Sequence, residues 1–214
     1  IVTNRRDDID LIRESYSNNL VFTLLADYNK MDMLDKVNIA DSSIVYINFE
    51  NDTDKLVHVL NLKKKYTNLK YIVTLDNTNL KETFLSAGVT YTVSKNEITS
   101  KLLASYIFEP DVARYSEDIL SFAEHEDDFD IKEFRITKEN RYKGKKYGDT
   151  FFQLKENADV ILIGLARIEA GIRVLMKNPP NETIVEEQDY LIMIMNGAAS
   201  LKIEQIFHTE EGGY

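Results

Sequence analysis

The chain has 214 residues, of which 43% are hydrophobic and 29% are charged, and its formal net charge is −10. No apolar run reaches the roughly 18–20 residues that span a bilayer, and the acidic balance disfavours binding to nucleic acid or anionic lipid, so we expect no nucleic-acid partner. The absence of cysteine excludes disulfides, thiolate zinc sites and a cysteine nucleophile, and it fits a reducing cytoplasm.

The first half of the chain alternates short β-branched runs with amphipathic stretches. This alternation is typical of βαβ units around a parallel sheet. The expected strands cover residues 1–3, 21–25, 44–47, 71–75 and 89–93. We therefore predict an α/β fold of the Rossmann-like, doubly wound kind for this half.

Helix signals fall between these strands. Asn51 and Asn77 stand where a side-chain oxygen can cap a new helix, and Gly88 stands where a helix needs a left-handed residue to end. Ser94 and Glu97 have the spacing of a capping box, in which each side chain satisfies a free backbone N–H. The helix that they start is expected to run to about residue 107.

The glycine-rich turn that opens a doubly wound domain does not occur in this sequence. Such a turn normally follows the first strand and receives phosphate at a helix N-terminus. There is no G-x-G-x-x-G, and residues 1–3 have the character of a second strand. We therefore expect the sequence to lack its first βα unit.

Pro110 interrupts the helical pattern that precedes it. Proline cannot donate a backbone hydrogen bond and it restricts the residue before it, so one helix must end and a second begin, over about 111–123. The acidic segment 124–128 then has the composition of a linker. We predict a first domain over 1–107, a helix-turn-helix crossover and linker over 108–128, and a second domain over 129–214.

Large apolar side chains recur along the two helices around Pro110, among them Tyr106, Phe108, Tyr115 and Phe122. They amount to more apolar surface than one small domain easily covers, and exposed surface of this kind usually marks a partner site. We predict that the segment 97–123 joins two copies of the chain.

Strands dominate the second domain. They are expected over 131–136, 160–167, 172–176 and 190–195, with a hairpin turn at 169–171 and a last helix over 198–207. This pattern predicts a small α+β domain that is distinct from the first half.

Short motifs in both halves resemble those of RCK (regulator of K⁺ conductance) or TrkA-type domains. In the first half they are Ser86 to Ser94 followed by Leu102-Leu103-Ala104, Ala26-Asp27 after the third strand, and Asn48 to Asp52 at the end of the fourth. In the second half they are Glu133 to Ile136, Gly164 to Arg167, Asn178-Pro179-Pro180, and Gln188 to Ile194, where Gln188-Asp189 replaces the usual Gly-Asp. The resemblance covers nearly the whole chain and implies a TrkA-C-like module in the second domain.

The resemblance also implies a function. It predicts a ligand-sensing, gating-ring domain on the cytoplasmic side of the cell membrane that controls potassium transport through a potassium channel. Such domains form dimers that build rings, and they contact a channel pore or a transporter subunit, so that the membrane is reached only through the attached pore. The expected ligand is Ca²⁺ or an adenine nucleotide such as NAD(H), ATP or ADP, acting because it binds one ring conformation better than another.

Two alternatives remain at this point. A free-standing regulatory subunit of a potassium uptake transporter is close to the first interpretation. A dinucleotide-dependent oxidoreductase belongs to another class, and it would need an acid or base in a substrate pocket. No Ser/His/Asp, Cys/His or paired-carboxylate arrangement in the sequence has catalytic spacing, so we predict that the chain is not an enzyme.

Three acids at the end of the fourth strand form the strongest candidate metal site. Glu50, Asp52 and Asp54 alternate across a strand-to-helix junction. Ca²⁺ takes six to eight hard oxygen ligands, and carboxylates that converge at one turn can supply several of them. The alternative is structural, because acids in the first turn of a helix offset the positive end of its dipole and can cap it.

The end of the second strand normally governs nucleotide choice in this fold. An acid there binds a ribose hydroxyl, whereas arginine suits an additional phosphate, and this chain carries Asn4 and Arg5. The resemblance adds Asp27 and Asn48 to the lining of the same crevice. The alternative is that the basic side chains are exposed and balance the acids that follow them.

Overall fold

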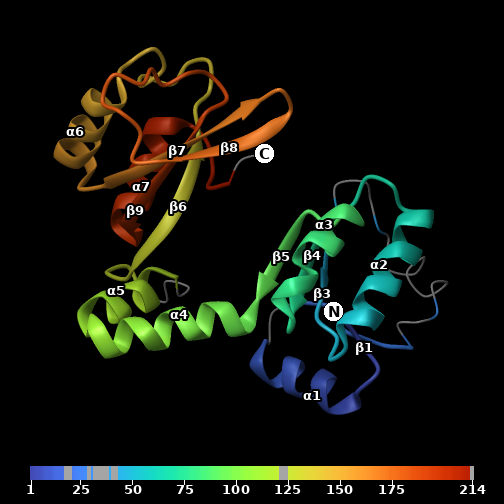
Figure 1. Cartoon of the computed structure of the whole chain (residues 1–214). Helices are drawn as coiled ribbons and strands as arrows, with labels where there is room; N and C mark the ends of the chain where they lie inside the picture. The colour runs from blue at the N-terminus through green and yellow to red at the C-terminus, as the bar shows by residue number, and fades with distance from the viewer. Residues whose placement is uncertain (17–20, 28–29, 31–38, 40–42, 121–124, 213–214) are drawn as a thin grey trace. The chain divides into compact units, whose positions relative to one another are not determined.

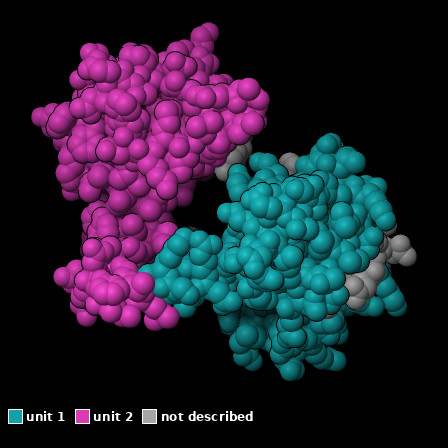
Figure 2. All heavy atoms as spheres, in the orientation of Figure 1, with its two compact units in different colours: residues 1–102 teal, residues 103–214 magenta. Residues whose placement is uncertain are grey.

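The computed structural model describes the chain except for residues 17–20, 28–29, 31–38, 40–42, 121–124 and 213–214. It divides into two compact units, residues 1–102 and 103–214, coloured separately in Figure 2. The sequence analysis predicted three segments rather than two, with the crossover and linker over 108–128 separate from both domains. This three-part division stays a prediction. Phe122 of the expected interface and Glu124 of the acidic segment lie outside the described part.

Parallel strands and helices alternate in the first unit, as Figure 1 shows. The elements are β1 (Val2–Thr3), α1 (Arg6–Ser15), β2 (Leu24–Leu25), β3 (Ile44–Ile47), α2 (Asp52–Lys65), β4 (Lys70–Leu75), a 3₁₀ turn η2 (Thr78–Leu80), α3 (Lys81–Ser86), β5 (Tyr91–Ser94) and the start of α4 (Lys95–Phe108). β1 pairs with β2, and β3, β4 and β5 form a second sheet in that order; every pairing is parallel. The predicted Rossmann-like α/β class is confirmed.

The core of the first unit lies around β4, the middle strand of its sheet. Tyr71, Val73 and Leu75 of β4 are buried, and so are Val59 of α2 and Phe84 of α3. A parallel strand with helices packed against it has no solvated face, which explains why β4 is almost continuously apolar rather than alternating. Because β4 is buried in this core, the residues at its carboxyl end have well-defined positions.

Three of the expected helix signals take the predicted form and one takes only half of it. Asn77 caps the 3₁₀ turn η2 by accepting from the Asn79 N–H at 3.1 Å. Asn51 caps α2 by accepting from the N–H groups of Thr53 and Asp54, and Gly88 adopts the left-handed conformation with φ +87°. At Ser94 the hydroxyl oxygen accepts from the Glu97 N–H at 3.3 Å. Among the described residues, the partner of the Glu97 carboxylate is Lys101, one turn later, so the second half of the capping box is not formed.

Pro110 is the first residue of α5 (Pro110–Leu120), and one residue, Glu109, separates it from the end of α4. Proline suits this position because the first N–H of a helix has no partner within the helix. The chain between residues 103 and 120 exposes many large apolar side chains, with Ile107 at 74% and Phe108 at 80% exposure. These helices hold few buried residues of their own, and Ala113 is the buried residue of α5.

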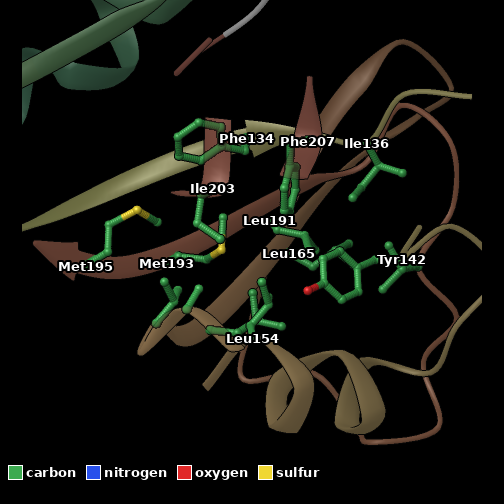
Figure 3. Packing of buried hydrophobic residues seen from close by; sticks show 14 of the residues in the cluster. Phe134, Ile136, Tyr142, Leu154, Leu165, Leu191, Met193, Met195, Ile203 and Phe207 are labelled. Carbon is green, nitrogen blue, oxygen red and sulfur yellow. The ribbon is translucent and has the colours of Figure 1, made fainter. Parts of the chain in front are cut away.

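The second unit is built around an antiparallel sheet. Its further elements are β6 (Phe129–Arg135), α6 (Tyr147–Ala158), β7 (Ile161–Glu169), β8 (Ile172–Lys177), β9 (Tyr190–Asn196) and α7 (Gly197–Phe207), and the strand order is β6-β9-β7-β8. Side chains from the sheet and from both helices converge in one core, where the rings of Phe134 and Phe207 lie 5.7 Å apart (Figure 3). This architecture matches the predicted α+β domain.

Helix α6 is the element that the sequence pattern did not predict. Its buried positions include Tyr147, Leu154 and Ala158, a spacing that places them on one helical face. Gly148 inside the first turn weakens the helical signal. Packing of this face against the sheet outweighs the weak local propensity.

Candidate ligand-binding site at the carboxyl ends of the parallel strands

The predicted site residues stand where parallel strands end. Asn4 and Arg5 follow β1, Asp27 follows β2, and Asn48 follows β3. Because β1 and β2 are parallel and paired in register, Asn4, Arg5 and Asp27 lie at the same edge of one sheet. Ligands of open α/β sheets bind at this edge, outside the carboxyl ends of the strands.

Arg5 stands at the start of α1 and leaves most of its side chain exposed, at 67%. Its backbone N–H donates to the Thr3 hydroxyl at 3.1 Å, and that hydroxyl donates to Asp8 Oδ2 at 2.8 Å. The Arg5 Nε lies 3.6 Å from Asp8 Oδ1, a loose ion pair. The predicted balance between the basic residues and the following acids is therefore present, but it does not bury the guanidinium.

Asn48 is held in place by the neighbouring strand. The Thr74 hydroxyl of β4 donates to Asn48 Oδ1 at 2.7 Å, and Thr74 itself is buried. At the end of β2, the Ala26 N–H donates to the Thr3 carbonyl at 2.9 Å, which fixes the backbone that precedes Asp27. The structure therefore gives Asn48 and the start of the Asp27 loop defined positions at their strand ends.

The three predicted metal ligands have different surroundings. Glu50 and Asp54 are exposed, whereas Asp52 lies over the end of β4 and is mostly covered. Both of its oxygens are engaged: Oδ2 accepts from the N–H groups of Asn77 at 2.9 Å and Asp76 at 3.2 Å, and Oδ1 accepts from Lys55. Within the described part of the chain, no three acids or histidines are grouped closely enough to hold a metal ion.

Lys55 is a buried charged residue at this edge that the sequence analysis missed. Its side chain is fully buried, and Nζ lies 2.7 Å from Asp52 Oδ1 and 3.5 Å from Asp76 Oδ2. The ammonium group is thus placed between a carboxylate that follows β3 and one that follows β4. A signal was available, because a lysine in the first turns of a helix opposes the helix dipole and needs a reason to be there.

The pKa of Asp52 reflects this setting. Burial of the carboxylate acts to raise its pKa, but the hydrogen bonds from Lys55 and from the N–H groups of Asn77 and Asp76 favour the charged form and outweigh burial. The net effect lowers the pKa of Asp52 below its ordinary value of 3.8. Asp52 is therefore ionised throughout the neutral range and stays paired with Lys55.

A small hollow adjoins this network at the ends of β4 and β5. It is lined by Leu75, Thr78, Lys81, Thr92, Ser94 and Glu97. Next to it the Asn96 amide donates to the Asp76 carbonyl at 3.2 Å, which joins the start of α4 to the end of β4. The ends of the three strands β3, β4 and β5 are thus connected by side-chain contacts into one polar surface.

The comparisons with known proteins agree with this architecture. Residues 1–95 match the family model of the TrkA-N domain. The gating ring of human SLO3 superimposes with a TM-score of 0.69 at 12% identity, over 97% of this chain and 45% of that structure. The RCK domain of GsuK and the GsuK channel bound to NAD match at 17% identity with a TM-score of 0.41, over 97% of this chain and 40% and 34% of those structures. Among curated proteins, no sequence matches.

Residues 1–95 therefore match the TrkA-N domain in sequence, and the chain shares the fold of the human SLO3 gating ring. The likeness to SLO3 at this identity establishes the fold, and the two GsuK superpositions are too loose to add to it. The chain spans less than half of the length of each of these structures. In the described residues there is no helix long and apolar enough to cross a bilayer.

Proposed function

We propose that this chain is a ligand-sensing regulatory module for potassium transport, and in particular part of the gating ring of a potassium channel. The observation that carries the proposal is the order of the two units. Residues 1–95 match the TrkA-N domain, an antiparallel α+β unit follows, and the chain shares its fold with the SLO3 gating ring. The module acts on the cytoplasmic side of the membrane through an attached pore. A free-standing regulatory subunit of a potassium transporter is the second candidate.

The module has no catalytic role in this proposal. A ligand that binds one conformation of the ring more tightly than another shifts the ring toward that conformation, which requires a binding edge and an assembly surface rather than a reacting group. The strand ends supply the edge, and the exposed helices around Pro110 supply the surface.

The ligand that we propose for this edge is an adenine nucleotide. Arg5 offers an exposed guanidinium at the start of α1, where backbone N–H groups and the helix dipole also favour an anion. Asn4, Asp27 and Asn48 would supply hydrogen bonds to ribose or base. We do not propose Ca²⁺ for the predicted site of Glu50, Asp52 and Asp54, because Asp52, which would be its central acid, already has a cationic partner in Lys55.

Arg5→Ala should weaken nucleotide binding to the chain by about tenfold or more, because a hydrogen bond to a charged group contributes about 1.5–3 kcal/mol. Titration calorimetry with NADH, ATP and ADP measures the effect. Arg13→Ala is the matched control, since it removes an exposed arginine from the other end of the same helix. Equal affinities of wild type and Arg5→Ala would contradict the assignment of this site, and so would equal losses in the two variants.

Tyr115→Asp should convert assembled chain into monomers. Tyr115 lies half-exposed on α5, close in sequence to the exposed Ile107, Phe108 and Val112, and a carboxylate on an apolar interface must be desolvated when the interface forms. Light scattering over a range of protein concentrations measures the mass. Ser116→Asp adds the same charge one residue along the helix and should leave assembly less affected. Monomeric wild type at high concentration would contradict the proposed interface.

A further inference from the structure

The contacts of Lys55 have a consequence for ion selectivity at the sheet edge. A buried ammonium group is costly unless it is paired, and here the cost is increased by its place as the fourth residue of α2, near the positive end of the helix dipole. Two carboxylates offset this cost, Asp52 at 2.7 Å and Asp76 at 3.5 Å from Nζ. The position of Nζ is thus a point where this chain stabilises a positive charge strongly.

We propose that Lys55 is a built-in cation that occupies the place of a divalent metal ion and so excludes Ca²⁺ and Mg²⁺ from this edge. Asp52 and Asp76 converge on one point from two strand ends, as the ligands of a hard cation do. The ammonium nitrogen stands at that point. Lys55 thereby sets the ligand preference of the edge against divalent cations, whether or not a nucleotide binds near Arg5.

The geometry shows what would follow if the ammonium group were removed. Ca²⁺ at the position of Nζ requires oxygens at about 2.3–2.6 Å, so the Asp52 oxygen is nearly in place and the Asp76 oxygen must move inward by about 1 Å. Such a shift is feasible because the side chain of Asp76 is 51% exposed. Asp52 is kept in its orientation by the N–H groups of Asp76 and Asn77, which do not depend on the lysine.

The test compares Lys55→Met with wild type in the complete chain. Hydrogen exchange of the β4 amides, with 10 mM CaCl₂ and with KCl at the same ionic strength, reports the opening equilibrium of the first unit. Lys55→Met should gain about tenfold in protection on adding Ca²⁺, given a dissociation constant of about 1 mM at the weak end of protein calcium sites. Wild type should show no such gain. The matched control is Lys64→Met, which removes an exposed lysine from the same helix and should behave as wild type.

Two further measurements guard against a variant that does not fold. Lys55→Gln keeps a donor toward Asp52 while removing the charge, and it should respond to Ca²⁺ as Lys55→Met does. In wild type, the amide NMR signals of Asp52, Asp76 and Asn77 should not move when CaCl₂ is added. Absence of a Ca²⁺ effect in a folded Lys55 variant overturns the proposal, as do Ca²⁺-dependent shifts of these signals in wild type. If neither variant folds, unmoved wild-type signals support it.

Discussion

Asp52→Ala should lower the free energy of unfolding of the first unit by about 3–5 kcal/mol, the usual cost of breaking a buried ion pair by removing one partner. The substitution leaves the fully buried Lys55 ammonium without its 2.7 Å partner and frees the N–H groups of Asp76 and Asn77. Asp54→Ala is the matched control, because Asp54 is an exposed acid in the same helical turn. Hydrogen exchange of the β4 amides measures the loss in this unit alone.

The pH dependence of this effect has a definite sign. The folded pKa of Asp52 lies below the ordinary value of 3.8, so Asp52 contributes its full stabilisation above that value and loses it as the pH falls through the folded pKa. The difference in stability between wild type and Asp52→Ala should therefore be constant near neutrality and shrink below about pH 4. A difference of less than about 1 kcal/mol at pH 7, as for an exposed pair, would show that Lys55 is not held as described.

Asp189→Ala should destabilise the second unit by a similar amount, about 3–5 kcal/mol. Asp189 is buried and accepts from Arg167 Nε at 2.8 Å and Nη2 at 2.6 Å, a two-pronged contact, and from the Glu186 N–H at 2.7 Å. Arg167 Nη2 also donates to the Ile184 carbonyl at 2.8 Å. The ion pair of Arg167 and Asp189 therefore holds the loop before β9 against β7.

Glu186→Ala provides the comparison for this second prediction. Glu186 approaches the same guanidinium at 3.4 Å, but its side chain is 60% exposed, so its loss should cost less than about 1 kcal/mol. Hydrogen exchange of the β9 amides distinguishes the two variants. Equal and small losses for Asp189→Ala and Glu186→Ala would mean that the loop is held by its backbone contacts rather than by the buried carboxylate.

Strands with strong apolar patterns were predictable from the sequence, and weakly patterned elements were not. β4 and β9 are buried on both sides or nearly so, which makes their apolar runs unmistakable, and the proline at 110 marks the break between α4 and α5. Helix α6 was missed because its stability comes from packing against the sheet, which local propensity does not report.

The backbone conformation of Gln188 explains why glycine usually stands at this position of the family motif. The motif before the last strand usually has Gly-Asp, and here Gln188 takes the glycine position with φ +74°. A left-handed residue at this point is what glycine normally provides. Asp189, the second residue of the motif, is the buried partner of Arg167. The sequence therefore indicated an important dipeptide, but its ion pair required the structure.

The strand-end positions of the candidate residues were predictable from the sequence, and their contacts were less so. The βαβ rhythm placed Asn4 and Arg5 at a strand end, and the resemblance to RCK or TrkA-type domains added Asp27 and Asn48. Asp52 and Lys55 are three residues apart in α2, a spacing that allows an ion pair. The burial of that pair and the contacts of Asp52 at the end of β4 depend on how α2 packs against the sheet, which spacing could not show. The acids Glu50 and Asp54 share its sequence neighbourhood but not its partners.

Rubidium flux in the cells from which the gene comes is the most direct test of the regulatory role. It should be compared in cells with the intact gene, with the gene deleted, and with Arg5→Ala or the control Arg13→Ala. We predict that deletion changes the rubidium flux, and that Arg5→Ala abolishes its response to cellular nucleotide depletion whereas Arg13→Ala does not. Rubidium flux that is the same with and without the gene would contradict a role in potassium transport.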